Sequence, residues 1–90
     1  MTNVIDVAKK CFRDEAEAIL NLMPKLDEDF TRAIELIIES KGKLIVTGVG
    51  KSGHIGAKIA STMASTGTPA FFVNPLDAFH GDLGMIGEGD

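Results

Sequence analysis

The residues with the clearest chemical potential lie in a glycine-rich run that follows a short apolar segment. Residues 43–48 are typical of a strand, and residues 48–54 read Gly-Val-Gly-Lys-Ser-Gly-His before a helical pattern begins. Glycines allow a tight turn and a close approach of the backbone to a ligand. The first turn of a helix offers unpaired N–H groups and a partial positive charge. The run therefore predicts an anion site, with a phosphate or a carboxylate as its ligand.

Lys51 stands in the middle of this run. A cation beside a helix N-terminus is unfavourable by about 0.3–1 kcal/mol, and the turn itself does not require one. A residue that breaks a local rule indicates a functional position, and the alternative is a solvated lysine that the loop tolerates. Ser52 also has two interpretations, as a ligand contact or as the N-cap of the following helix.

A second candidate segment is residues 80–82, which read His-Gly-Asp. Histidine can carry a proton near neutral pH, so His80 is a candidate for acid–base work. Taken alone, the His80 and Asp82 pair is weak evidence for catalysis, because a solvent-facing histidine at a turn is commoner than a catalytic one. His54 and His80 are the two histidines of the chain, and Cys11 is its one cysteine. That supply of ligands does not favour a zinc site, and we expect no metal.

The elements that must position these residues follow a strand–helix–strand pattern. Residues 43–48 and 70–73 are apolar strands, and residues 54–66 are helical, with Gly67 and Pro69 ending the helix. Such a unit almost always makes adjacent parallel strands joined by a right-handed crossover. The expected fold class is therefore α/β.

A short helical turn is expected after the second strand. Asn74 and Pro75 match an N-cap and a first helical position, and residues 76–80 then form one turn that Gly81 ends. This turn would place His80 at its end.

Two amphipathic helices are expected before the first strand. The first runs to about Met23, where Pro24 forces a boundary, and the second covers residues 27–40, with Gly42 as a left-handed stop. Their acidic polar sides favour packing in a core or between subunits over a membrane surface, which prefers Lys and Arg. Cys11 lies on the apolar side of the first helix, so we expect it to pack in a core rather than act as a nucleophile.

Composition limits the class of protein. The chain has 90 residues, is 44% hydrophobic and 24% charged, and carries a net charge of −4, which suits at most one globular unit. Without a basic stripe, Tyr or Trp, it does not resemble a nucleic-acid surface. Its N-terminus lacks the apolar region of a signal peptide and no apolar stretch is long enough for a membrane span, so we expect a cytoplasmic location.

The glycine spacing also matches a nucleotide-binding pattern. Gly48, Gly50 and Gly53 form G-x-G-x-x-G between a strand and a helix, as in dinucleotide-binding folds. That fingerprint expects an acidic residue about 20 positions further on to hold the ribose, and residues 73–75 here read Val-Asn-Pro. The phosphate-binding Walker A pattern also fails, because Ile45 occupies its first glycine position. A dinucleotide-binding fragment is the weakest of the functional alternatives.

Residues 46–85 resemble the sugar isomerase (SIS) domains, and among them the D-arabinose 5-phosphate isomerases. The resemblance rests on Gly-Val-Gly-Lys-Ser-Gly-His-Ile-Gly at 48–56, Ala-Ser-Thr-Gly-Thr-Pro at 64–69, Phe-Phe-Val at 71–73 and His-Gly-Asp-Leu-Gly-Met at 80–85. It implies interconversion of D-ribulose 5-phosphate and D-arabinose 5-phosphate for the Kdo sugar of lipopolysaccharide. It implies a sugar-phosphate ligand, no redox cofactor and a homo-oligomer in the full-length form.

The resemblance also assigns roles to residues. It implies that Lys51 lies in the active site and that residues 80–82 lie near it, so the expected catalytic residues are Lys51 and His80. The residues expected to bind substrate are Gly50, Ser52, Gly53, His54 and Asp82. A sugar-phosphate-binding SIS module without catalysis is the alternative.

The chain departs from the family at its end. It stops at Asp90, before the serine-rich phosphate loop, the glutamates, the further histidine and the CBS pair that such isomerases carry. We therefore expect residues 1–42 to be an N-terminal helical segment and residues 43–90 to be the first part of a truncated SIS domain. The 90 residues are not expected to be active alone.

Overall fold

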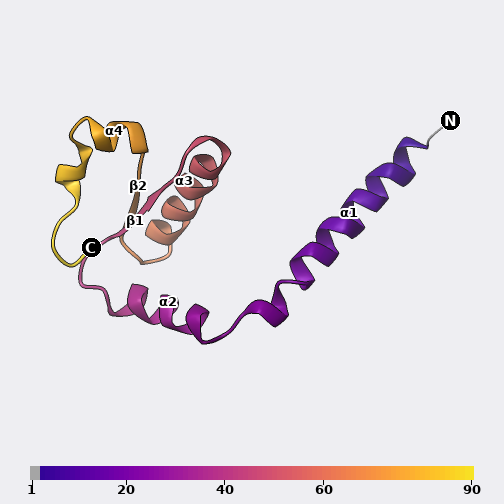
Figure 1. Cartoon of the computed structure of the whole chain (residues 1–90), viewed down its shortest axis with the longest axis horizontal. Helices are drawn as coiled ribbons and strands as arrows, with labels where there is room; N and C mark the ends of the chain where they lie inside the picture. Colours follow the sequence, from indigo (N-terminus) through magenta and orange to yellow (C-terminus); the bar gives the residue numbers. More distant parts are fainter. Residues whose placement is uncertain (1–2) are drawn as a thin grey trace. The chain divides into compact units, whose positions relative to one another are not determined.

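The computed structural model describes residues 3–90 and divides into two compact units, one ending at Glu35 and one covering Leu36–Asp90. In chain order the elements are α1 (Val4–Leu20), the 3-10 turn η1 (Met23–Lys25), α2 (Glu28–Glu39), β1 (Leu44–Thr47), α3 (Gly50–Ser65), β2 (Ala70–Val73), α4 (Pro75–Phe79) and the 3-10 turn η2 (Asp82–Met85) (Figure 1). The boundary between the units falls inside α2. The expected division into domains at residues 42 and 43 stays a prediction.

Helix α1 ends earlier than the expected position near Met23. Its last residue is Leu20, and Pro24 lies in the 3-10 turn that follows. A proline ring clashes with the carbonyl four residues before it, which for Pro24 is the carbonyl of Leu20, so the helix stops there. At its other end the side chain of Asn3 caps α1 by accepting a hydrogen bond from the N–H of Ile5 at 2.9 Å.

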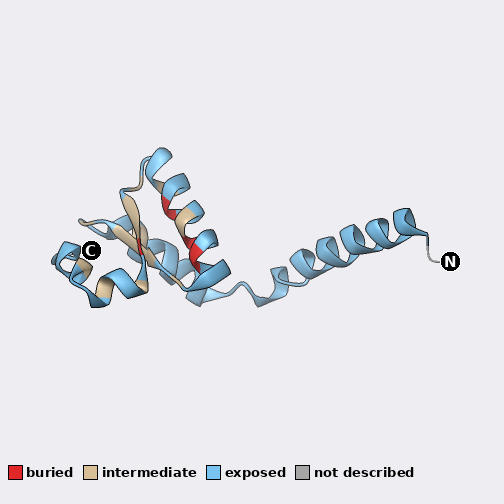
Figure 2. Ribbon diagram, turned by 90° about the horizontal axis from the view of Figure 1, so that it is seen from above, coloured by how far each residue is buried: buried red, intermediate tan, exposed pale blue. Residues whose placement is uncertain are grey.

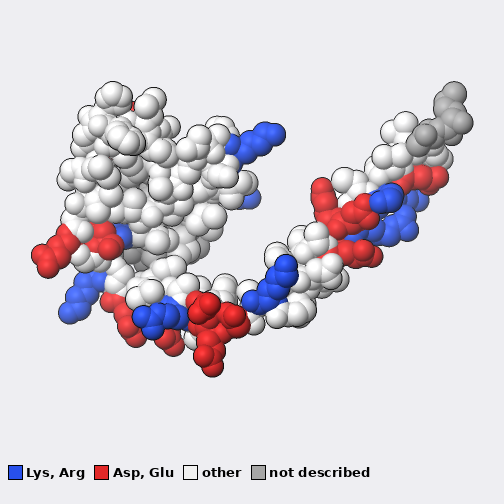
Figure 3. Space-filling view, in the orientation of Figure 1, with Lys and Arg blue, Asp and Glu red and all other residues white. Residues whose placement is uncertain are grey.

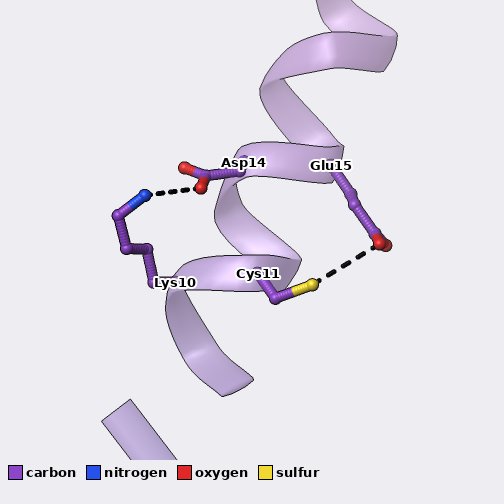
Figure 4. A network of polar contacts seen from close by, with 4 residues as sticks. All are labelled: Lys10, Cys11, Asp14 and Glu15. Carbon is purple, nitrogen blue, oxygen red and sulfur yellow. Dashed lines mark hydrogen bonds and ion pairs between the residues drawn. The ribbon is translucent and has the colours of Figure 1, made fainter. Parts of the chain in front are cut away.

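The surface of α1 carries both signs of charge (Figure 3). Lys10 donates to Asp14 one turn away at 2.6 Å, and the thiol of Cys11 donates to the carboxylate of Glu15 at 3.5 Å (Figure 4). None of the residues of α1 is buried. The expectation that Cys11 packs in a core is therefore wrong within this unit.

The environment of Cys11 disfavours a nucleophilic role. The hydrogen bond to Glu15 and the negative charge of that carboxylate raise the pKa of the Cys11 thiol. Because the thiolate is the nucleophile, a raised pKa keeps this side chain in its unreactive form.

Helix α2 matches the expected range to within one residue at each end, but Gly42 does not act as a left-handed stop. The glycines with positive φ among the described residues are Gly50, Gly67, Gly81 and Gly89. A Cβ on Gly42 would lie 2.6 Å from the carbonyl carbon and oxygen of Gly89. Gly42 is therefore required for the close approach of the C-terminal residues, and the stop interpretation is wrong.

The two strands pair in parallel, as the strand–helix–strand pattern predicts. Leu44 pairs with Ala70 at one end and Thr47 with Val73 at the other, where the Thr47 hydroxyl also donates to the Val73 carbonyl at 2.6 Å. Helix α3 connects the strands and packs against them. Its buried residues lie on the side that faces the sheet (Figure 2): Gly53, Gly56 and Ala60.

Helix α3 begins at Gly50, four residues before the expected start. Val49 occupies the N-cap position, and Gly50 has a φ of +59°. The glycines of the first turn have low helix propensity, so the sequence pattern does not predict a helix there. The end of α3 follows the expectation, because Gly67 has a φ of +104° and the next N–H, that of Thr68, donates to the Met63 carbonyl at 2.9 Å.

Helix α4 is capped as the sequence predicts. The side-chain oxygen of Asn74 accepts a hydrogen bond from the N–H of Leu76 at 2.9 Å, and Pro75 is the first helical residue. His80 follows the last residue of this short helix.

Candidate functional site

A hollow lies at the carboxyl end of the two parallel strands. Because Thr47 pairs with Val73, the residues that follow them, Gly48 and Asn74, emerge at the same edge of the sheet. Ligands of open α/β sheets bind at this edge. The hollow has a volume of about 270 Å³ and is lined by Gly48, Gly50, Gly53, His54, Ala57, Phe72 and Asn74.

The first turn of α3 gives the hollow an electrostatic character that suits an anion. No backbone hydrogen bond from the amides of residues 50–52 is found within the described chain, and the amide of Gly53 donates to the Val49 carbonyl at 3.4 Å. Unpaired amides and the partial positive charge at a helix N-terminus attract phosphate and carboxylate groups.

The glycines of this turn also let α3 approach the strand edge. A Cβ on Gly53 would lie 2.6 Å from the carbonyl oxygen of Gly48, a distance that real side chains do not adopt. Gly53 is buried. A residue with a side chain at this position would push the first turn away from β1 and change the shape of the hollow.

Three of the residues expected at the site line the hollow, namely Gly50, Gly53 and His54. Lys51 and Ser52 belong to the same helical turn, are exposed, and are not part of the lining. Lys51 forms no ion pair with another residue in the range 3–90.

Ser52 is not an N-cap. It is the third residue of α3, and Val49 holds the N-cap position without a side-chain hydrogen bond. The N-cap interpretation of Ser52 is therefore wrong. Since its hydroxyl donates to no described residue, Ser52 is free to contact a ligand.

His80 and Asp82 are not brought into the lining of the hollow. His80 is exposed after α4, and Asp82 is half-buried at the start of η2, with Gly81 between them at a φ of +121°. Their expected roles near the site stay predictions.

Sequence reasoning missed Ala57, Phe72 and Asn74 as lining residues. Asn74 had a signal that could have placed it there, because it directly follows the second of two parallel strands. The sequence predicts its capping role, and its position directly after a parallel strand also predicts a place at the carboxyl edge of the sheet.

A larger hollow of about 950 Å³ lies elsewhere in the same unit. Its lining joins the last residues of α2 to the amino ends of the strands and to the C-terminal residues, and it includes Leu36, Ile37, Leu44, Ile45 and Ile86. The smaller hollow is the candidate ligand site, because the unpaired amides lie there and parallel sheets bind ligands at their carboxyl ends.

The described residues offer neither a cluster of metal ligands nor a membrane-spanning helix. Residues 3–90 contain no group of three or more His, Cys, Asp or Glu side chains that could hold a metal ion. No helix in the same range is long and apolar enough to cross a membrane.

The SIS domain family matches residues 36–90, which include the hollow and every element around it. The chain belongs to the SIS domain family. The resemblance noted from the sequence is thereby confirmed, and so is the α/β fold class.

Relatives extend well beyond this SIS domain chain. Arabinose 5-phosphate isomerase KdsD of Pseudomonas aeruginosa is 49% identical over 86 residues, which are 96% of the chain and 26% of the relative. KdsD of Francisella tularensis is 53% identical over 93 residues, covering 100% of the chain and 28% of the relative. The chain therefore spans about a quarter of the length of these curated relatives.

A solved structure shares the fold of the SIS domain chain. The protein c3406 of E. coli CFT073, in complex with arabinose 5-phosphate, superposes with a TM-score of 0.91 at 40% identity. The match covers 100% of this chain and 49% of that protein.

Proposed function

We propose that this chain is the amino-terminal part of a cytoplasmic isomerase that interconverts D-arabinose 5-phosphate and D-ribulose 5-phosphate for Kdo and lipopolysaccharide synthesis. The observation that carries the proposal is the match along the whole chain to c3406, which was solved with arabinose 5-phosphate, at 40% identity. Relatives at 49% and 53% identity bear the name arabinose 5-phosphate isomerase. The hollow beside the first turn of α3 supplies amides that suit a sugar phosphate.

The proposed chemistry gives Lys51 an electrostatic role. Converting the aldose to the ketose removes a proton from C2 and returns one to C1, so negative charge builds up on the enediolate oxygens between the two steps. A cation near those oxygens stabilises the charge. Lys51 lies in the turn that borders the hollow and has no carboxylate partner within the described chain, so its ammonium group is free for this role.

The remaining site residues are assigned around this centre. Amides of the turn that contains Gly50, Ser52 and Gly53 bind substrate oxygens, and the exposed imidazole of His54 borders the same hollow. His80 is the proposed proton carrier and Asp82 a further substrate contact. For the last two, the support is the resemblance of residues 80–85 to the isomerases.

A second function is favoured by one observation. His80 and Asp82 do not line the hollow, so within the described residues the proposed proton carrier His80 is not part of the anion site. The chain would then be a sugar-phosphate-binding SIS module that does not turn its ligand over.

The deciding experiment is the substitution Lys51→Ala in a protein of the relatives' full length that carries this sequence. We expect the rate of arabinose 5-phosphate isomerisation to fall by at least about 100-fold, because electrostatic and acid–base groups contribute on this scale. Lys58→Ala is the matched control, since it removes an exposed lysine from the same helix but beyond the first turn that borders the hollow. A wild-type rate for Lys51→Ala would remove Lys51 from the mechanism. Binding without turnover in the unsubstituted protein would favour the non-catalytic module.

Self-association belongs to the same proposal. The apolar side chains along α1 are exposed, and burying them against a second copy would stabilise both helices. We therefore propose a homo-oligomer of the full-length protein.

A further inference from the structure

Asn74 is one of two residues that bring a polar side chain to the small hollow. The other lining residues are three glycines, Ala57 and Phe72, which offer backbone or apolar atoms, so the remaining polar side chain is that of His54. A ligand in the hollow that needs side-chain hydrogen bonds can therefore obtain them there from Asn74 and His54.

The capping hydrogen bond of Asn74 uses its side-chain oxygen and leaves its side-chain nitrogen available. Its Oδ1 accepts the N–H of Leu76 at 2.9 Å, which fixes the orientation of the amide group. Its Nδ2 carries two N–H donors and makes no hydrogen bond to another residue in the described chain. Because Asn74 is exposed, these donors are open to a ligand.

The place of Asn74 in the fold also bears on which ligand is selected. Dinucleotide-binding folds place an acidic residue at the end of the second strand, where it accepts hydrogen bonds from a ribose diol. Here the residue that follows β2 is Asn74, whose free group is a donor rather than an acceptor. A donor suits an acceptor oxygen, such as that of a phosphate or of a sugar carbonyl.

We propose that Asn74 binds the sugar phosphate by donating from Nδ2 to one of its acceptor oxygens, while its Oδ1 caps α4. This inference rests on the proposed function and adds a binding residue to it. The same cap gives Asn74 a fixed orientation, so the donor is held in place before the ligand arrives, which lowers the entropy cost of binding.

Nuclear magnetic resonance tests the contact without any substitution. The chain has three asparagines and no glutamine, so the spectrum contains three side-chain amide pairs, from Asn3, Asn21 and Asn74. On titration with D-arabinose 5-phosphate we expect the Asn74 pair to shift and the other two pairs to stay in place. A shift of the backbone amides of residues 48–54 with an unmoved Asn74 pair would overturn the proposal and leave the sugar-phosphate site standing.

Asn74→Asp tests the donor by substitution. Aspartate has the same shape and keeps an oxygen for the N–H of Leu76, but it replaces the donor with an anionic acceptor. We expect the Kd for arabinose 5-phosphate to rise at least about tenfold, because a charge-assisted hydrogen bond is lost and repulsion is added. Equal Kd values for the substituted and unsubstituted chains would overturn the role of Asn74 alone.

Asn3→Asp is the matched control. Asn3 caps α1 in the same way, accepting the N–H of Ile5 at 2.9 Å, and it lies outside the lining of the hollow. The same change of charge and of cap should therefore leave the Kd unaltered. If the unsubstituted chain shows no shift and no measurable Kd with arabinose 5-phosphate, the sugar-phosphate site and the role of Asn74 both fall.

Discussion

At the scale of the residue, Asp90 ties the end of the chain to the start of β1. Its carboxylate accepts the N–H of Lys43 at 2.8 Å and the N–H of Gly87 at 2.8 Å. The hydroxyl of Ser40 donates to the carbonyl of Gly89 at 2.9 Å in the same place. The hydrogen bond from Lys43, followed by that from Gly87, lowers the pKa of Asp90 below its ordinary value.

This lowered pKa predicts a dependence of stability on pH. Because the pKa of Asp90 is lower in the folded chain than in the unfolded chain, its stabilising contribution is fully present above the unfolded pKa. It is lost as the pH falls through the folded pKa. Asp90→Asn removes the charge while keeping the shape, so we expect it to be less stable than the unsubstituted chain at about pH 6. The difference in the free energy of unfolding between the two chains should vanish below the folded pKa of Asp90. Chemical denaturation at about pH 6 and at a pH below that pKa measures it.

Glu88→Gln is the control for general charge effects. Glu88 is exposed in the same segment, and its carboxylate accepts no hydrogen bond within residues 3–90. Glu88→Gln should therefore show the same change in the free energy of unfolding between the two pH values as the unsubstituted chain. An equal pH dependence in the unsubstituted chain and in Asp90→Asn would show that the contacts of Asp90 do not stabilise the fold.

The sequence could predict some residues of the site but not this contact. Gly50, Gly53 and His54 form part of one continuous run, so their closeness follows from local geometry. Asp90 and Lys43 are 47 positions apart, and no local pattern connects them. The role of Gly42 was misread for the same reason, because the backbone that it must admit comes from a distant segment.

At the scale of the element, the packing of α3 against the strands depends on glycines inside the helix. Gly53→Ala would place a Cβ 2.6 Å from the backbone oxygen of Gly48, which cannot move without displacing the strand edge. Alanine normally stabilises a helix relative to glycine by about 0.5–1 kcal/mol. Here we expect the clash to dominate and the free energy of unfolding to fall by about 1–3 kcal/mol, measured by denaturation.

Gly84→Ala is the control for the change of residue type. A Cβ at Gly84 would meet nothing within 4 Å, and its φ is not positive. Its effect should stay within about 0.5 kcal/mol of the unsubstituted chain. If Gly53→Ala were as stable as Gly84→Ala, α3 would not approach β1 as closely as the structure has it.

The order of elements could be predicted, whereas their ends could not always be. The second strand was predicted at Ala70–Val73, where the structure has it, since its apolar run is bounded by Pro69 and Asn74. The start of α3 lies earlier than the sequence predicts, because the positive φ of Gly50 and the close packing at Gly53 favour glycine there despite its poor helix propensity. Tertiary contacts decide where such a helix begins, and a local sequence pattern carries no information about those contacts.

At the scale of the whole molecule, little apolar surface is buried. The buried hydrophobic residues of the described chain are Ala60 and Val73, while large apolar side chains of both units are exposed. Helix α1 is an extreme case, since none of its residues is buried. Most helices in proteins gain their stability by packing an apolar face rather than from helix propensity. The apolar side chains of α1 therefore need a partner surface.

We expect that partner to be a second copy of the chain. Val4, Phe12 and Ile19 lie on one side of α1 by helical spacing and are 80%, 73% and 68% exposed. Burying a phenylalanine contributes about 1.5–3 kcal/mol, so Phe12→Ser should weaken self-association by about 10- to 100-fold, as measured by sedimentation equilibrium. Arg13→Ser changes an exposed charged side chain outside this apolar side and should leave the association unchanged. A chain that sediments as a monomer with Phe12 intact would mean that another surface covers α1.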